Sequence, residues 1–578
     1  MSSEEQIRAE VSAAVMLERQ TPEYQTALAK VQGNPHYVPE DSPTYEQLVA
    51  DRDDEYVGLA RRFCAHHGGA FVYDNTVQRW YRSNCTHWDM DIDRCHLGAV
   101  AELAPPFEAQ AEFFDELASQ AFEAEAAEID KDLAKEHKAR GKAMQKVAKS
   151  WESVAKRLKE PTSMKKVLEL ASAGMTSLGI SGSEWNKHAN LLVTKNAVID
   201  LETGKEVSAS PSLYLNQHSP VEWTGLHTES ELWDEFLSQV FLGNQQLIDY
   251  VQACVGYWIS GFNSVQEFWT LWGPQGRNGK GVFFRTLRAV MGNYYVSLDP
   301  QMLMDTKFQR QGGGPSPELV NLRFKRLAVA SESKKGAMFS MDAIKRWTGG
   351  DPIPCRGMAS DNIVELLPEF KLLFVTNRLP QVSDATDNAF RSRLRIIKFL
   401  ARFSSVASEV DTARNIFPMD PRLEQKLHTP PVLSAVLAWA VRGALRFFRD
   451  GMRLEAPLDV LAETDSYMAD QDMIGQFIRC ALTITDGLSK ERRSGAKDVY
   501  LAFKRWCVED QLVSEKYVPT MASFGRDLKS RPDIKTVPPI NVICYNVVIR
   551  EEWRAKEKEG SWVSAQASAS STAEPDLR

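Results

Sequence analysis

The sequence predicts an α/β fold with a central, mostly parallel sheet, a mixed α+β accessory domain before it and a small module after it. Three observations favour this sheet. Between residues 268 and 399, short apolar runs alternate with helix-like stretches, the order that builds parallel sheets. The first run, Phe268 to Leu271, leads through a glycine-rich loop into a helix-like stretch. Two later runs, ending at Glu332 and Asn377, place a polar side chain at the carboxyl end of a strand, where open sheets bind ligands.

Length and composition limit the class of protein. A chain of 578 residues is too long for one core and suggests roughly three or four domains. Its 43% hydrophobic and 25% charged residues are ordinary for a soluble protein, and no apolar run reaches the roughly 18 residues of a membrane span. Residues 1–10 contain no signal-peptide core, and the eight cysteines form no CxxC pair. We therefore expect a cytoplasmic protein with reduced thiols and no membrane partner.

The elements before the sheet follow in order. A helix pattern over residues 56–67 ends at Gly68-Gly69, and residues 71–81 form a hairpin pattern with Asp74-Asn75 at its turn. Residues 101–173 are rich in Ala, Glu and Lys, first acidic and then basic, which predicts a helical hairpin that pairs its own charges or a contact between protomers. Short strands follow at 191–193 and 197–201, and residues 233–259 are again helical.

These patterns divide the chain into six expected units. Four prolines punctuate the polar start of the chain, and the last residues are rich in Ser and Ala, so both ends are expected to lack fixed structure. The units are a flexible segment 1–51, an accessory α+β domain with the charged helical segment 52–225, the sheet domain 226–405, a helical connector 406–475, a C-terminal module 476–555 and a disordered tail 556–578.

The glycine-rich loop predicts a nucleoside triphosphate site. Such a loop turns its backbone N–H groups toward an anion, the positive end of the following helix points at the same place, and a lysine adds a full charge near the β- and γ-phosphates. The loop comprises Gly273, Pro274, Gln275, Gly276, Arg277, Asn278, Gly279, Lys280, Gly281 and Val282. Pro274 replaces the leading glycine of the general pattern and Gly281 the usual Ser or Thr, so a glycine turn with a chance lysine is the alternative interpretation.

Three downstream features predict hydrolysis of the triphosphate. Glu332 after one apolar strand is placed to organise Mg²⁺ and to activate water. Asn377 after the next is placed to hydrogen-bond the γ-phosphate or the water, although it could merely cap a turn. Arginines at 391, 393 and 395 alternate as on one face of a strand, and guanidinium groups stabilise phosphoryl charge. The order of these elements is more specific than any one of them.

Charge is segregated along the chain, although the net charge is −8. Residues 108–130 contain eight acids and no Lys or Arg, whereas residues 323–347 contain seven Lys or Arg against two acids. Residues 390–402 add five more Lys or Arg and no acid. Basic blocks beside a nucleotide site suit a motor that grips a phosphate backbone; a solvated basic face is the alternative.

With these motifs, the sequence closely resembles the superfamily-three helicases of the phage, plasmid and poxvirus primase-helicase family. The resembling stretches are Gly276 to Phe283, Leu327 to Glu332, Lys345 to Ile353, Phe370 to Asn377 and Ala389 to Arg395. The resemblance implies an AAA+-like ATPase that uses ATP and Mg²⁺, assembles as a hexamer on single-stranded or forked DNA, and moves 3′ to 5′ during replication of a phage or other mobile element in the host cytoplasm. Fainter likeness on both sides implies an accessory domain before the motor and a winged-helix module after it.

The resemblance also implies roles for individual residues. Lys280 is the phosphate lysine, Glu332 the catalytic acid and metal ligand, Asn377 the sensor, and Arg393 the first choice for a finger that acts on a neighbouring subunit, with Arg391 and Arg395 as rivals. DNA contacts are expected from Lys345, Arg346 and Arg356 in the motor, and from Arg526 and Lys529, with Arg531, in the winged-helix module.

Departures from the family pattern leave alternatives open. Gly281 offers no hydroxyl to Mg²⁺, and Ser331 stands where a second acid often precedes the glutamate. A primase site would need acids, and the candidate Asp89, Asp91 and Asp93 has no obvious partner histidine in the sequence. A zinc site from the cysteines and histidines of residues 64–96 fits no recognised spacing, so buried thiols and surface histidines are favoured.

Two rival functions follow. One is an origin-binding initiator or assembly platform, in which nucleotide only organises a ring. The other is a helicase-primase fusion; without priming in the chain, a separate primase or polymerase is the expected partner. Strand separation, sequence-specific duplex binding and primer synthesis discriminate among the three.

Overall fold

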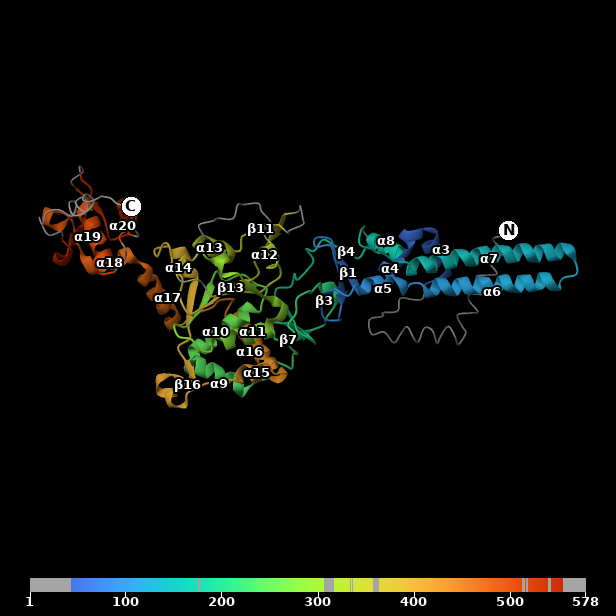
Figure 1. The fold of residues 1–578 in the computed structure, drawn as a ribbon, viewed down its shortest axis with the longest axis horizontal. Coiled ribbons are helices and arrows are strands. Elements are labelled where there is room, and N and C mark those ends of the chain that lie inside the picture. Colours follow the sequence, from blue (N-terminus) through green and yellow to red (C-terminus); the bar gives the residue numbers. More distant parts are fainter. Residues whose placement is uncertain are drawn as a thin grey trace, which may run out of the picture.

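The computed structural model of the chain describes residues 43–174, 177–305, 317–332, 334, 336–356, 363–511, 515, 518–538 and 542–554. The expectations for residues 1–42 and for the tail 556–578 lie outside the described residues. Figure 1 shows an elongated molecule with a helical hairpin at one end, the parallel sheet in the centre and a separate C-terminal module at the other end.

The first domain begins earlier than the sequence suggested. Helix α3 (Tyr45–Asp53) is fixed by a capping box in which Thr44 and Gln47 bond each other's backbone, so the expected flexible segment does not extend to residue 51. Helix α4 (Glu55–His67) follows, as expected. A four-stranded sheet of order β3-β2-β1-β4 packs beside them. Its strands are β1 (Phe71–Asp74), β2 (Arg79–Ser83), β3 (Trp88–Met90) and β4 (Gly179–Ile180).

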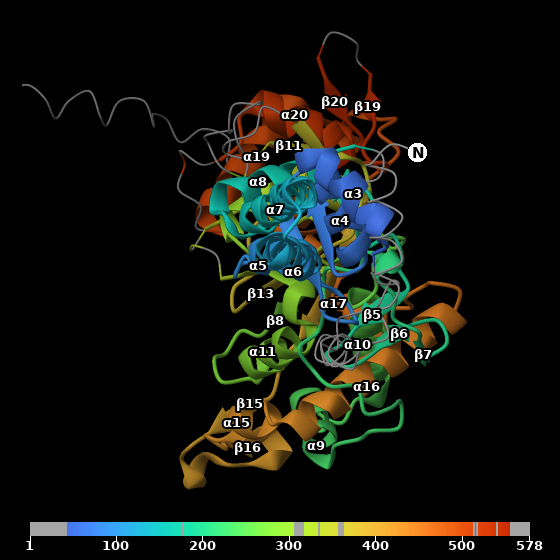
Figure 2. The same cartoon turned by 90° about the vertical axis from the view of Figure 1, so that its right-hand side faces the viewer.

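The predicted helical hairpin is confirmed. Helices α6 (Pro105–Ala127) and α7 (Lys131–Lys159) run side by side, and Figure 2 shows them nearly end-on. Ion pairs join Lys138 to Glu125, at 2.7 Å, and Lys159 to Glu108 across the hairpin. Helices α5 (Cys95–Ala101) and α8 (Pro161–Ala171) complete its base. These two pairs between the acidic and basic halves of the sequence are therefore made within one chain.

A short β segment leads to the central domain. Strands β5 (Leu191–Val193), β6 (Val198–Asp200) and β7 (Lys205–Val207) form an antiparallel sheet, as their pattern predicted. Helices α9 (Glu231–Val240) and α10 (Gln245–Trp258) follow. The buried Arg326 fastens the two parts together, because its guanidinium donates to the carbonyls of Leu191 and Ile259, each at 2.6 Å.

The central sheet has five strands in the order β14-β8-β13-β10-β9, and every pairing is parallel, as predicted. The strands are β8 (Phe268–Trp272), β9 (Tyr295–Leu298), β10 (Leu327–Ser331), β13 (Lys371–Thr376) and β14 (Leu394–Lys398). Nearly all residues of β8, β10 and β13 are buried, because helices cover both faces of a parallel sheet. The carboxyl ends of all five strands therefore lie at one edge.

Alternate residues of each strand enter two different cores. Trp269, Val329 and Leu373 pack with α10, α11 (Lys280–Met291) and α16 (Pro430–Arg449). Phe268, Ala328 and Phe374 face a second core, to which α13 (Met341–Thr348), α14 (Asn388–Arg393) and α17 (Leu458–Gln471) contribute. The remaining short elements are α12 (Pro317–Val320), α15 (Leu423–Leu427), β11 (Ile353–Arg356), β12 (Ile363–Leu366), β15 (Arg402–Ser404) and β16 (Ile416–Pro418).

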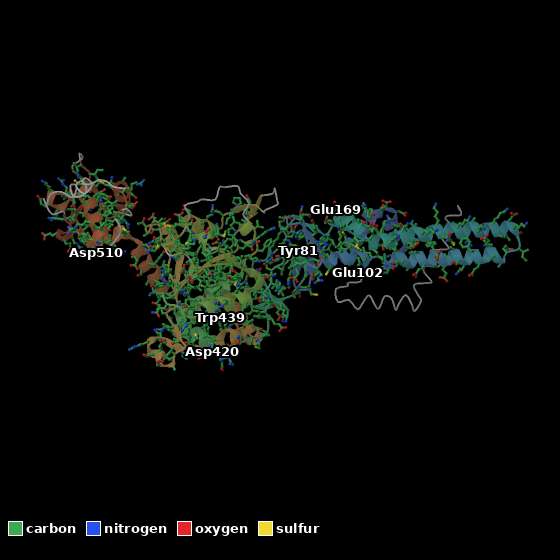
Figure 3. All side chains as sticks on the ribbon, in the orientation of Figure 1. Tyr81, Glu102, Glu169, Asp420, Trp439 and Asp510 are labelled. Atoms are coloured by element: carbon green, nitrogen blue, oxygen red, sulfur yellow. The ribbon has the colours of Figure 1, made fainter. Side chains whose placement is uncertain are left out.

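Helix α16 corrects the expected connector. It crosses α10 so closely that a Cβ on Gly256 would stand 2.0 Å from the Ala444 nitrogen, and Trp439 lies in the interior of the central domain (Figure 3). Within the described chain, α16 is also the helix that is long and apolar enough to cross a membrane, with 61% of its apolar window buried. Its apolar residues are explained by this core, so residues 430–449 belong to the central domain.

The C-terminal module has its own core and is reached through α17. Helices α18 (Met473–Ala481), α19 (Ala496–Glu509) and α20 (Met521–Lys529) surround it. Two small antiparallel sheets of order β17-β21 and β18-β20-β19 close it. Their strands are β17 (Leu482–Ile484), β18 (Ser494–Gly495), β19 (Thr536–Val537), β20 (Cys544–Tyr545) and β21 (Val547–Ile549).

Candidate nucleotide site

The glycine-rich loop joins β8 to α11, as the sequence predicted. Two of its glycines are required by close approach. A Cβ on Gly273 would stand 2.0 Å from Asn278 Nδ2, and one on Gly279, whose φ is +82°, would stand 2.6 Å from Val240. Asn278 donates from Nδ2 to the Gln275 carbonyl at 2.7 Å, which ties the loop to itself. The loop is therefore held in shape by contacts within the protein.

Three predicted residues from distant parts of the sequence converge at this loop. Lys280 Nζ donates to Asn377 Oδ1 at 2.6 Å and to the Gly273 carbonyl at 3.2 Å. Asn377 Nδ2 in turn donates to Glu332 Oε1 at 3.4 Å. The register explains this meeting, because β10 and β13 are neighbours in which Ser331 pairs with Val375, and both chains continue past the same edge of the sheet.

Burial lowers the pKa of Lys280 to about 8, and the Glu332 carboxylate partly opposes that shift. Among the described residues, two neutral oxygens accept hydrogen bonds from the ammonium group. A triphosphate would offer formal negative charge in their place. The site is consequently poised to take up an anion and to hold the lysine proton more tightly once that anion is bound.

We expect nucleotide affinity to fall as pH rises. At a pH below its pKa of about 8, Lys280 carries its charge. At a higher pH, a triphosphate that requires the charged form binds only if the lysine also takes up a proton. The dissociation constant of a fluorescent ATP analogue should therefore rise from about pH 7 to about pH 9, approaching about tenfold per unit above the pKa. The matched control is Lys280→Arg, whose guanidinium stays charged throughout, so its profile should be flat. A flat profile in the unaltered chain would contradict this prediction.

Glu332 lies just beyond β10 with φ +60°, a left-handed conformation that costs a non-glycine residue roughly 1–2 kcal/mol. Its backbone N–H donates to the Val375 carbonyl at 2.9 Å, which holds the turn in place. The side chain is exposed and accepts one long bond from Asn377, so its oxygens keep lone pairs for further ligands. Backbone outliers of this kind gather at functional sites.

The residues around Glu332 fit Mg²⁺ bound together with a nucleotide. Mg²⁺ keeps several waters and uses one or two carboxylates plus substrate phosphates. Glu332 offers the carboxylate. Mg²⁺ there would neutralise phosphate charge, while the protein supplies one anionic ligand.

The arginine cluster is not a strand face, which corrects the expected geometry. Asp387 caps a helix by accepting from the Phe390 N–H, so Arg391 and Arg393 lie in α14, and Arg395 lies in β14. Arg391 donates to Asp465 at 2.8 Å, and Arg393 donates to neutral partners, namely Gln266 at 2.9 Å and Thr348 at 3.2 Å.

Arg395 is held differently from its two neighbours. Its guanidinium pairs at 2.5 Å with Glu267, which is 9% exposed, and burial raises the pKa of that carboxyl to about 7. Removing the arginine would leave a buried carboxylate unpaired. Arg395 therefore stabilises the buried Glu267.

The predicted DNA-binding residues are scattered. Lys345 on α13 is paired with Asp387 at 2.8 Å and Asp342 at 3.2 Å, whereas the adjacent Arg346 is exposed. Arg356 ends β11, and its side chain lies outside the described residues. Arg526 and Lys529 are exposed on α20.

Arg531 is not available for phosphate contacts. It forms a two-point ion pair with Asp472, at 2.5 and 2.7 Å, and both side chains are mostly buried. This pair ties the C-terminal module to the end of α17.

In the structure, histidines lie beside two of the three aspartates of residues 89–93. Asp91 lies 2.6 Å from His96 Nδ1, and Asp89 lies 3.2 Å from His87 and 4.0 Å from His218. His218 is distant in sequence and carries no local signal, so the pattern could not find it. The seven cysteines and histidines weighed for zinc do not converge in the part of the chain that the structure describes, where the clustered group is His87, Asp89 and His218.

Comparisons with known proteins find family models and relatives that are similar to this sequence. A model described as "D5 N terminal like" matches residues 60–242, and a family of unknown function (DUF5906) matches residues 271–393. Viral proteins provisionally named helicases match up to 56% of the chain. The chain therefore contains a D5 N-terminal-like domain of the primase-helicase type and is similar to viral proteins named as helicases.

The relatives of this D5-like chain are large viral proteins. Helicase 121R of Invertebrate iridescent virus 3 is 28% identical over 342 residues, covering 55% of this chain and 35% of the relative. Helicase L207/L206 of Acanthamoeba polyphaga mimivirus is 25% identical over 325 residues, covering 55% and 33%. The match thus spans about a third of the length of these relatives. The solved NrS-1 C-terminal region shares 12% identity at a TM-score of 0.35, covering 60% of this chain and 81% of that one.

Proposed function

We propose that this D5-like chain is an ATP-dependent DNA helicase with an AAA+-like motor, moving 3′ to 5′ during replication of a phage or other mobile element. The observation that carries the proposal is the meeting of Lys280, Asn377 and Glu332 at the phosphate loop. The strand order β14-β8-β13-β10-β9 supports the motor assignment, because it places the loop strand β8 between β13, which leads to Asn377, and β14, which begins directly after Arg393.

The resting contacts suggest how ATP would be used. The β- and γ-phosphates would take the place of Asn377 Oδ1 and the Gly273 carbonyl on Lys280. Asn377, released from the lysine, would then bond the γ-phosphate or the attacking water. Glu332, 3.4 Å from Asn377 Nδ2, would then orient that water and take its proton.

The proposal extends to assembly. An arginine from a neighbouring subunit would complete the site, so we propose a hexameric ring with ATP and Mg²⁺ at each seam. Arg346, with Lys345 and Arg356, would face DNA in the motor, and Arg526 and Lys529 would contact phosphates if the C-terminal module acts as a winged helix. A soluble protein in the host cytoplasm, working with a separate primase or polymerase, fits this role.

Strand displacement on tailed duplexes tests the function. With ATP, the chain should release the labelled strand from a 3′-tailed substrate and leave a 5′-tailed one paired; without ATP, neither should separate. The matched protein control is Arg288→Ala, which removes an exposed charge from α11 away from the loop and should unwind normally.

Three results would overturn the assignment in different ways. Unwinding from the 5′ tail would reverse the direction. Sequence-specific duplex binding without displacement would favour an origin-binding initiator. Primer synthesis on single-stranded template would favour a helicase-primase.

A further inference from the structure

Three metal-ligating side chains meet at the junction between the accessory domain and the central domain. His87 Nε2 lies 3.2 Å from Asp89 Oδ1, and His218 Nδ1 lies 4.0 Å from the same oxygen. The two imidazole rings stand 4.0 Å apart between centroids, and the ligand atoms of the three residues all lie within 4.8 Å of one another. His87 is 4% exposed and Asp89 45% exposed, so the group is open to solvent on the carboxylate side.

The hydrogen bonds around His87 show which ring nitrogen carries the lone pair. Asn84 Oδ1 accepts from the backbone N–H of His87 at 3.0 Å, which fixes the orientation of the amide. Asn84 Nδ2 then donates to His87 Nε2 at 3.0 Å and to Asp89 Oδ2 at 2.9 Å. Since Nε2 accepts, the ring proton belongs on Nδ1, 2.9 Å from Thr86 Oγ1.

This arrangement leaves two electron-pair donors facing each other. Neither His87 Nε2 nor Asp89 Oδ1 carries a proton, and they lie 3.2 Å apart. His218 Nδ1, 4.0 Å from Asp89 Oδ1, adds a third. Neutral imidazole and ionised carboxylate are the forms that bind metal ions.

The three donors come from two parts of the chain. His87 and Asp89 flank Trp88 at the start of β3, next to β2, whose Tyr81 lies at the junction (Figure 3). His218 lies between β7 and α9, and its carbonyl accepts from the Asn293 N–H at 3.0 Å. The next residue, Ser219, donates to the Val290 carbonyl at the end of α11, the helix that begins with Lys280.

We propose that His87, Asp89 and His218 bind one divalent transition-metal ion of the zinc class, which clamps the accessory sheet to the helix of the phosphate loop. Two nitrogen donors and one carboxylate suit Zn²⁺ or Co²⁺, whereas Mg²⁺ and Ca²⁺ prefer oxygen alone. Tetrahedral zinc, with bonds of about 2.0–2.1 Å, separates neighbouring ligand atoms by about 3.3 Å. The His87–Asp89 spacing already fits, His218 closes by a small shift, and water takes the fourth position.

Cobalt titration of the metal-free chain tests the proposal. We expect one Co²⁺ per chain with the visible d–d bands of a four-coordinate site, displaced by Zn²⁺, and a higher unfolding temperature with Zn²⁺. Asp89→Asn and His218→Ala should weaken binding at least tenfold. His96→Ala is the matched control, since it removes a histidine 2.6 Å from Asp91 but outside the group. Unaltered affinity in His218→Ala, or no saturable binding by the native chain, would overturn the proposal.

A variant that gains a spectroscopic band distinguishes loss of a ligand from misfolding. His218→Cys keeps a ligand at this position, so its cobalt complex should show a thiolate-to-cobalt charge-transfer band that the native chain lacks. A folded, cobalt-loaded His218→Cys chain without that band would show that residue 218 is not a ligand. These readouts report metal alone, so they stand or fall independently of ATP hydrolysis and unwinding.

Discussion

Replacing Glu332 with glutamine is expected to lower DNA-stimulated ATP hydrolysis by about 10²- to 10⁴-fold, the usual contribution of a general base. Glutamine keeps the size of the side chain and an oxygen for the Asn377 N–H, so the loop and the Lys280 contacts should persist. Nucleotide binding should therefore remain while turnover is lost. Steady-state phosphate release and binding of a fluorescent analogue measure the two effects separately.

The control for Glu332→Gln is Glu235→Gln. Glu235 is an exposed carboxylate on α9 that bonds Gln239 at 2.9 Å, so its replacement removes the same charge away from the site. Lys280→Ala complements the pair, because it should lose binding as well as turnover. Full turnover in either Glu332→Gln or Lys280→Ala would refute the nucleotide site.

Arg393→Ala is expected to lower ATP turnover by about 10³- to 10⁵-fold if this arginine acts as the finger of a neighbouring subunit. Arg393 is held by neutral partners, Gln266 and Thr348, whereas Arg391 would have to leave the Asp465 carboxylate. Breaking neutral hydrogen bonds costs less, so Arg393 is the easier of the two to release toward a neighbour.

Mixing two inactive variants shows whether the arginine acts on a neighbouring subunit or within its own subunit. Arg393→Ala and Lys280→Ala should each be inactive alone, but a mixed ring contains seams with an intact lysine on one side and an intact arginine on the other. ATPase activity should reappear at intermediate ratios. No recovery with Arg393→Ala, together with recovery when Arg391→Ala is used instead, would assign the finger to Arg391.

Much of the fold could be predicted because local pattern and global topology agree. The strands of the central sheet read as continuous apolar runs since both of their faces are covered, and β8 leads directly into the loop. The meeting of Lys280, Asn377 and Glu332 followed from the rule that parallel strands present their carboxyl ends at one edge.

Other features depended on contacts that no local pattern records. The arginine run 391–395 alternates like a strand, but the Asp387 cap turned its first part into a helix. Helix α16 was expected to be a connector. Its close crossing with α10, where Gly256 meets Ala444, shows that it belongs to the core of the central domain. His218 meets Asp89 across more than a hundred positions of sequence, a distance at which spacing carries no information.

Helix α17 gives the C-terminal module a mechanical link to the edge of the sheet. Its Thr464 accepts from the Ile396 N–H at 3.2 Å, its Asp465 holds Arg391, and its far end leads to Asp472, which grips Arg531. A movement of the C-terminal module would thus be transmitted through α17 to β14 and to Arg391.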